Sequence, residues 1–209
     1  MDSSMPIENS KSPSLALMSD AGIIAQLLEL QPVIGSERNV WAFWNRGLSN
    51  CPAWCQRNVV SWVRRLAPSW TVRVLDCVEG SPVHISKYVD DSFFPEVFNQ
   101  QKLAGPHVGP HTADLVRLPL LYLYGGVWLD VGFLLFRSLD DLCWKMLADP
   151  TQPFEMAGFR IAFSAERNAM FNGFIAARKG NSCIKHWHDI CLEVWRGRTT
   201  TFSRDFELS

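Results

Sequence analysis

An aspartate and an arginine stand among apolar residues in a predicted helix and could act together chemically. Asp114 and Arg117 are three residues apart on the helix that we predict from about Thr112 to Leu123, so their side chains are neighbours on one face. The residues around them are almost all apolar, and a buried carboxylate or guanidinium usually has partners and often a task. Carboxylates accept hydrogen bonds from hydroxyl groups, and a guanidinium neutralises phosphate charge. We therefore expect a polar binding site on this helix.

A second carboxylate follows on the next predicted strand. The pair Gly125-Gly126 reverses the chain at a place where side chains would obstruct tight packing or a ligand. The apolar strand that follows, 127–130, ends in Asp130. Ligands of open α/β sheets bind outside the carboxyl ends of the strands. The helix, the turn and the strand are therefore expected to direct two carboxylates and a guanidinium towards one crevice.

Strands and helices alternate along the rest of the sequence. The predicted strands cover 39–44, 70–75, 127–130 and 157–163, and the predicted helices cover 52–66, 112–123, 139–147 and 181–195. A further helix is predicted within the apolar stretch 15–34, where Ser19 or Asp20 could cap it and Pro32 ends it. The order strand, helix, strand before residue 76 favours a parallel pair with a crossover helix. We predict an α/β sandwich, with a mostly parallel central sheet flanked by helices. It forms one domain over 15–198, between a disordered tail at 1–14 and a polar tail at 199–209.

The composition is typical of a soluble globular protein. The chain has 209 residues, of which 47% are hydrophobic and 20% charged, and this is enough for one substantial domain. A formal charge of −1 argues against a nucleic-acid binder, which normally has a basic excess. Asp20 and Glu29 interrupt the apolar stretch 15–34, so it suits an amphipathic helix better than a membrane span. Because no signal-peptide pattern begins the sequence, we expect a cytoplasmic protein.

The segment ADLVRLPLLYLYGGVWLD at 113–130 resembles the core motif of DXD-type sugar transferases of glycosyltransferase family 32. It is most similar to the capsular polysaccharide synthesis proteins, whose segment has the form sDlvRl-LLy-yGGvWlD. NVWAFW at 39–44 resembles the first strand of that group, and FNGFIAARKGN at 171–181 resembles its downstream strand and helix. The resemblance spans roughly Asn39 to Gly197. It implies a GT-A fold, a nucleotide-binding α/β sandwich that uses a sugar nucleotide as donor.

The resemblance also implies roles for particular residues. By similarity, Trp44 or Trp41 would stack on the nucleobase, and Asp114 and Arg117 would hold the donor sugar and its phosphates. Asp130 would match the first acid of the DXD motif, which contacts the ribose, the sugar or the metal. Asp130 and Arg117 would be the catalytic residues. The full donor-binding set that this implies is Trp41, Trp44, Asp114, Arg117, Gly125, Gly126, Asp130 and Asn172.

The sequence departs from the family motif at Gly132, where a second acid would be expected. In the DXD motif this acid binds Mn²⁺ or Mg²⁺, and the cation stabilises the departing diphosphate. Gly132 has no side chain to offer. Asp130 would then bind a cation alone, together with phosphate and water, or no metal would be used. Asp140 and Asp141 are the nearby acids that could substitute, although their positions predict the start of a helix.

The leading hypothesis is transfer of a hexosyl group from a UDP- or GDP-sugar to a hydroxyl acceptor, with retention of anomeric configuration. Two alternatives remain open. The fold could have been repurposed for a cyclisation or isomerisation of a lipophilic small molecule, or the chain could be a catalytically inactive binding module. Transferases of this architecture usually continue beyond the point where this sequence stops. The protein would therefore be naturally short, incomplete, or built differently on its acceptor side.

Overall fold

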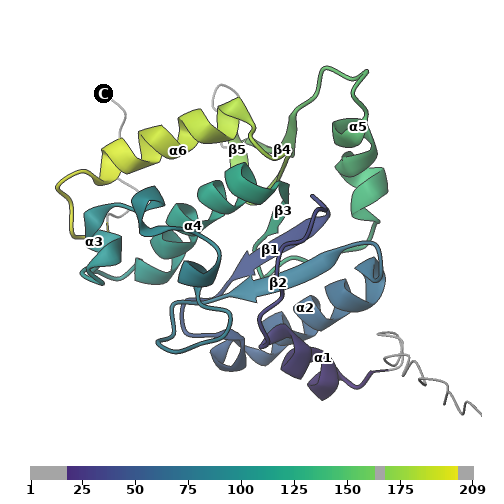
Figure 1. Cartoon of the computed structure of the whole chain (residues 1–209), viewed down its shortest axis with the longest axis horizontal. Coiled ribbons are helices and arrows are strands. Elements are labelled where there is room, and N and C mark those ends of the chain that lie inside the picture. The colour runs from purple at the N-terminus through teal and green to yellow at the C-terminus, as the bar shows by residue number, and fades with distance from the viewer. Residues whose placement is uncertain (1–17, 163–167, 202–209) are drawn as a thin grey trace, which may run out of the picture.

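Within residues 18–162 and 168–201, which the computed structural model describes, five strands form one central sheet (Figure 1). The strands are β1 (Asn39–Phe43), β2 (Thr71–Leu75), β3 (Gly126–Leu129), β4 (Met156–Ala162) and β5 (Asn168–Ala177). They lie in the order β2-β1-β3-β5-β4. β1 pairs in parallel with β2 and β3, whereas β5 is antiparallel to β3 and β4. All strands except β5 therefore run in one direction, which confirms the mostly parallel sheet.

Helices cover both faces of this sheet (Figure 1). The α-helices are α1 (Asp20–Leu27), α2 (Ala53–Leu66), α3 (Glu96–Asn99), α4 (Val108–Tyr124), α5 (Lys145–Ala148) and α6 (Ser182–Trp195). Three 3-10 turns lie at Leu48–Asn50, Ile85–Lys87 and Asp91–Phe93, and a π-helical turn, η5 (Asp140–Trp144), leads into α5. α1 and α2 pack on one face, and α4 and α6 on the other. None of the helices in the described ranges has both the length and the apolar character that a bilayer crossing requires.

Alternation along the central strands divides the core into two layers. Val40 and Ala42 of β1 pack towards α1 and α2, whereas Trp41 and Phe43 pack towards α4. Successive side chains of a strand point to opposite faces of the sheet, so a strand covered on both sides has no polar face to show. The whole of β1 and β3 is accordingly buried. Because helices cover both faces of the sheet, polar residues can reach solvent at the carboxyl ends of β1 and β3.

The elements follow the predicted ranges closely, with two main differences. The first predicted helix begins where expected, with Ser19 as its cap, but α1 ends at Leu27, before Pro32. α4 begins at Val108, four residues earlier than predicted, although Gly109 and Pro110 indicated a loop. Proline is tolerated in the first turn of a helix because its missing N–H would have no partner there. The predicted tail at 1–14 lies outside the described residues, as do residues 202–209 of the other tail.

Candidate active site

A pocket of about 840 Å³ opens at the carboxyl ends of β1 and β3, beside the first turn of α4. Five of the eight predicted donor-binding residues line it, and they come from four different parts of the chain. The lining residues are Phe43, Trp44, Asn45, Arg46, Asn50, Gly105, Pro106, Val108, Gly109, Pro110, Ala113, Asp114, Arg117, Asp130, Val131 and Asn172. The structure therefore brings together the two carboxylates and the guanidinium that the sequence placed in one crevice.

Arg117 is the centre of the polar cluster in this pocket. Its guanidinium pairs with Asp114 at 2.7 Å, lies 4.0 Å from the nearer oxygen of Asp130, and donates to the backbone oxygen of Asn172. Its Cζ also lies 5.0 Å from the ring centre of Trp128. Only 5% of the Arg117 side chain is exposed. Arg117 therefore holds the surrounding groups in place, and little of it is left to contact a ligand.

The two carboxylates differ in their surroundings. Asp114 accepts hydrogen bonds from Arg117 and from the amide of Asn172, at 3.0 Å. Burial raises the pKa of Asp114, and the nearby Asp130 adds to this, while Arg117 and His111 act in the opposite direction. Asp130 is 42% exposed, and its Oδ1 accepts a hydrogen bond from the indole N–H of Trp128 at 2.8 Å. Both carboxylates keep acceptor capacity that faces the pocket.

Gly173 of β5 allows the Asp130 carboxylate to adopt this position. A Cβ atom at residue 173 would lie 2.7 Å from Oδ2 of Asp130 and 2.8 Å from the ring of Phe171. The backbone N–H of Asp130 donates to the carbonyl oxygen of Gly173, at 2.9 Å, where the two strands adjoin. A side chain here would displace either the carboxylate or the aromatic ring.

Trp44 and Trp41, the two candidates for base stacking, are in different environments. Trp44 follows the end of β1, is half-buried, and lines the pocket. Trp41 is completely buried under α4, where it contacts Tyr88 and Tyr124 and donates to the carbonyl oxygen of Gly125. A ring enclosed in this way has no face open for a ligand, so only Trp44 remains a stacking candidate.

Gly125 and Gly126 lie at the opposite edge of the sheet from the pocket. Gly125 precedes β3 and Gly126 begins it, whereas Asp130 follows it, and four residues of strand span about 13 Å. Both glycines have positive φ, of 66° and 108°, and a Cβ atom at residue 126 would lie 2.3 Å from the backbone oxygen of Asn39. The predicted donor-binding role does not fit this placement. These glycines allow the end of α4 to turn tightly against β1.

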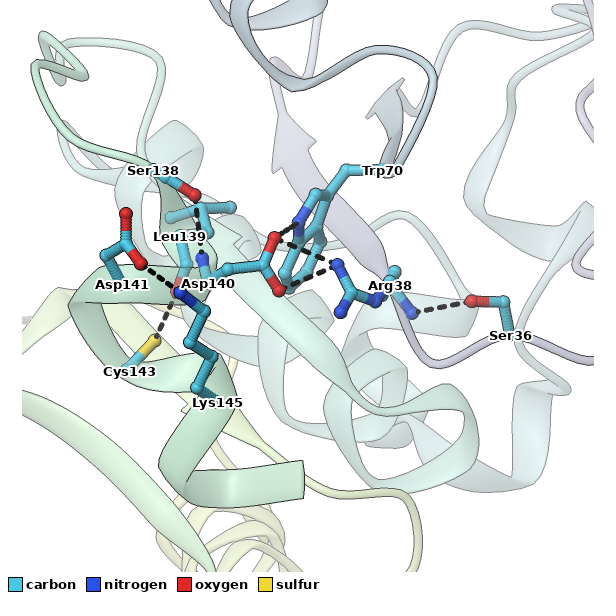
Figure 2. A network of polar contacts seen from close by, with 9 residues as sticks. All are labelled: Ser36, Arg38, Trp70, Ser138, Leu139, Asp140, Asp141, Cys143 and Lys145. Carbon is cyan, nitrogen blue, oxygen red and sulfur yellow. Dashed lines mark hydrogen bonds and ion pairs between the residues drawn. The ribbon is translucent and has the colours of Figure 1, made fainter. Parts of the chain in front are cut away.

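Asp140 and Asp141, the two candidate substitute ligands, are engaged outside the pocket (Figure 2). Asp140 pairs with Arg38 at 2.7 Å and accepts a hydrogen bond from the indole N–H of Trp70 at 3.0 Å. Asp141 pairs with Lys145, one turn further along the chain. Figure 2 shows the two carboxylates pointing in different directions from the start of η5. Asp140 joins η5 to the residues that precede β1 and β2, whereas the Asp141 pair stays within the η5–α5 segment.

Sequence reasoning missed the basic side of the pocket. Arg46 lies three residues after β1, is exposed, and makes no ion pair within the described residues. The first turn of α4, at Val108 and Gly109, lines the same pocket, and backbone N–H groups in a first turn have no partner within the helix. The rule that singled out Asp130, that ligands bind at carboxyl ends of strands, would also have indicated Arg46.

The pocket residues fit a cation only if it is brought by a ligand. Among the described residues, no group of three or more His, Cys, Asp or Glu side chains is placed to hold a metal ion. The Arg117 guanidinium fills the space between the two carboxylates, and Gly132 adds no ligand. Asp130 is the more exposed of the two carboxylates, and it has no direct ion pair as short as that between Asp114 and Arg117. Mg²⁺ is commonly bound through one carboxylate together with substrate phosphates and water. That arrangement would suit a cation carried by a diphosphate.

The fold is that of a glycosyltransferase. The structure superposes on the solved structure named PaToxG Glycosyltransferase with a TM-score of 0.58, over 85% of this chain and 69% of that chain. The two sequences are only 15% identical, so this likeness concerns the fold alone.

Residues 20–203 match the family described as Capsular polysaccharide synthesis protein, and the chain belongs to this family. It is 59% identical to Glycosyltransferase afumC of Aspergillus fumigatus, over 88% of this chain and 47% of the relative. It is 53% identical to O-glycosyltransferase braB of Annulohypoxylon truncatum, over 84% of this chain and 42% of the relative. For O-glycosyltransferase PaGT of Phomopsis amygdali the identity is 40%, over 87% and 45% respectively. The chain thus spans less than half the length of these relatives.

Proposed function

We propose that the pocket binds a sugar nucleotide, and that the protein transfers the hexosyl group to a hydroxyl acceptor as a retaining transferase of the glycosyltransferase family 32 type. The observation that carries this proposal is the position of Asp114, Arg117 and Asp130 around one pocket at the carboxyl ends of β1 and β3. The three relatives reported above are named as a glycosyltransferase or an O-glycosyltransferase, and these names support the same reaction.

Each side of the pocket suits a different part of the donor. Trp44 offers an aromatic face to the base. Arg46 and the first turn of α4 offer positive charge and open N–H groups to the diphosphate. Asp114 and Asp130 offer acceptors to the hydroxyl groups of ribose or sugar. The pocket therefore offers an aromatic ring, basic groups and acidic groups, one kind for each part of a nucleotide donor.

In the proposed reaction, the bond from the anomeric carbon to the diphosphate breaks and a bond to the acceptor oxygen forms, while the proton of the acceptor hydroxyl passes to the departing diphosphate. Negative charge develops on the leaving diphosphate, and Arg46 with the positive end of α4 stabilises it. Arg117 acts through its neighbours, because it fixes Asp114 and Asn172 by direct contacts. When a divalent cation accompanies the diphosphate, it would supply further charge neutralisation beside Asp130.

Release of nucleoside diphosphate from UDP-glucose and GDP-mannose tests the transferase proposal. We expect slow hydrolysis of at least one donor without acceptor, and a loss of about 100-fold or more in Asp130→Asn. The anomeric configuration of the released sugar, followed by NMR, tests retention. A protein that binds donors but never releases nucleoside diphosphate from them would instead be an inactive binding module.

A further inference from the structure

Trp54 and Phe171 flank the end of β3 on either side of Asp130. Trp54, in the first turn of α2, is 53% exposed, and a Cβ atom at Gly132 would meet its ring at 3.5 Å. Phe171 comes from β5, and its ring lies over Gly173, against which the Asp130 carboxylate also rests. Two aromatic rings from distant parts of the chain thus lie over two glycines beside the same carboxylate.

The helix that carries Trp54 is fixed to the loop after Asp130. One turn along α2, the amide of Asn58 donates to the carbonyl oxygen of Val131, at 3.1 Å. A further turn along, the indole of Trp62 donates to the carbonyl oxygen of Phe133, at 3.0 Å. Residues four apart on a helix share one face, so this single face of α2 holds the loop at successive points. The exposed ring of Trp54 is therefore placed by the fold, and is not a side chain that extends freely into solvent.

These rings lie just outside the donor pocket. Val131 lines the pocket, whereas Trp54 and Phe171 do not. An acceptor that approaches the sugar of a bound donor from the side of the loop after Asp130 would contact them. The nearby side chains give it few polar partners: Phe133 contacts Phe171 at 5.6 Å between ring centres, and Leu134 is 62% exposed. A carbohydrate acceptor would need hydrogen bonds at this rim, which an apolar surface does not supply.

We propose that Trp54 and Phe171 form the acceptor subsite, and that they bind an acceptor whose hydroxyl group is carried on an apolar ring system. Aromatic side chains bury large apolar area and stack on flat ring faces in offset or edge-to-face geometry. The acceptor ring would pack between the two side chains with its hydroxyl group directed at the donor sugar beside Asp130. This inference rests on the proposed function.

Binding of 2-naphthol to the UDP-saturated protein, measured by NMR titration, tests the subsite. We expect Trp54→Ala and Phe171→Ala each to weaken 2-naphthol binding about 3- to 10-fold, and Trp54→Phe to restore most of it. Phe154→Ala is the matched control, since Phe154 is 52% exposed and lies outside the donor pocket. It should leave 2-naphthol binding unchanged. The Kd for UDP should be the same in all four variants.

The UDP titration separates the two proposals. If neither UDP nor GDP binds the wild-type protein, the proposed function itself is wrong; if only GDP binds, GDP replaces UDP in these titrations. If UDP binds normally but Trp54→Ala and Phe171→Ala bind 2-naphthol like the wild type, the subsite is wrong while the donor pocket stands. Weaker UDP binding in the same variants would show a structural role for these rings and would also overturn the inference. Methyl β-glucoside binding more tightly than 2-naphthol would contradict the apolar class of acceptor.

Discussion

Arg117 is the side chain on which the geometry of the candidate site depends. It is nearly inaccessible to solvent, yet it contacts Asp114, the backbone of Asn172 and the face of Trp128, and lies 4.0 Å from Asp130. A buried guanidinium with several fixed partners positions those partners better than it binds a ligand. The exposed Arg46 has the opposite character, because it lines the pocket without an ion pair within the described residues. The two arginines should therefore respond differently to substitution.

Arg117→Lys should destabilise the protein by about 2 kcal/mol, because lysine keeps the charge but cannot bridge several acceptors. The expected loss is moderate because Asp114 is partly exposed, and solvent screens its interaction with the cation. Arg46→Ala should change the free energy of unfolding by less than about 0.5 kcal/mol but weaken donor binding about tenfold. Urea unfolding and donor titration of both variants check this pair. An Arg46→Ala variant with wild-type donor affinity would refute the phosphate role of Arg46.

Asp114 should make donor binding sensitive to pH. Burial holds the pKa of this carboxyl above the usual range of aspartate, against the effect of Arg117 and His111 and with that of Asp130. The ionised form accepts the hydroxyl hydrogen bonds, so donor affinity should fall as pH drops through this raised pKa. A raised pKa in the folded state means that wild-type stability gains relative to Asp114→Asn as pH falls towards the unfolded-state value.

Parallel titrations of the wild type and Asp114→Asn between pH 4 and pH 7 (roughly the range that a raised aspartate pKa covers) measure both effects. Asp114→Asn should bind donor weakly, and its affinity should not fall further as pH drops. In urea unfolding, the stability of the wild type relative to the variant should instead rise as pH drops. If donor affinity falls equally at low pH in Asp114→Asn, the titration of another group causes the fall.

At the scale of elements, the close-packed turn between α4 and β3 should affect the stability of the fold and leave donor binding unchanged. Gly126 has φ of 108°, and a Cβ atom there would lie 2.3 Å from the backbone of Asn39. Gly126→Ala should therefore destabilise the fold by about 3 kcal/mol or more. The protein that remains folded should bind donor normally, because the junction lies at the far edge of the sheet. Gly132→Ala is the control, because its Cβ atom would make an ordinary contact of 3.5 Å with Trp54.

Thermal unfolding and donor titration of these two glycine variants provide the measurement. Gly126→Ala should lose thermal stability and Gly132→Ala should keep it. A folded Gly126→Ala protein with reduced donor affinity would instead support the donor-binding role that the sequence suggested for this turn.

The sequence predicted most elements because their patterns are local. Helix α2 and the first two strands have clear periodicity, and the three-residue spacing of Asp114 and Arg117 is enough to place them on one face of a helix. The first turn of α4 was missed because Gly109 and Pro110 are also typical of loops. In that case the tertiary contacts of the helix decide, and local propensity does not.

The site itself could be predicted only in part. Trp41 and Trp44 are three residues apart near the end of one strand, and sequence alone cannot tell which of them a helix will cover. The place of Gly125-Gly126 was predictable in principle, since the start and the end of a strand lie at opposite edges of a sheet. The contact between Trp54 and the loop at Gly132 depends on how α2 packs, which no local pattern records.

At the scale of the whole molecule, one pocket collects residues from the end of β1, the start of α4, the end of β3 and β5. Its rim includes Gly105, whose neighbour Ala104 pairs with Thr199 and Thr201 near the end of the described chain. The candidate donor site is therefore built by segments spread over most of the described residues. Its integrity depends on the complete sheet and on both helical layers.

The cation should bind together with the nucleotide. Asp130 is the single accessible carboxylate that we assign to it, so Mn²⁺ alone should show no saturable binding at micromolar concentration. With UDP present, Mn²⁺ should bind at the donor site and Asp130→Ala should abolish the effect. Calorimetric titration of Mn²⁺ with and without UDP measures this. Tight Mn²⁺ binding without nucleotide would reveal a closed metal site.

Titration of the protein with UDP- and GDP-sugars is the most direct test of the central claim that this pocket is a donor site. We predict that at least one donor binds in the micromolar range, with Asp114→Ala and Asp130→Ala each reducing its affinity about tenfold or more. The control Asp141→Ala, at an exposed acid outside the pocket, should bind like the wild type. Absence of binding to every donor, or equal binding in all three variants, would contradict the account.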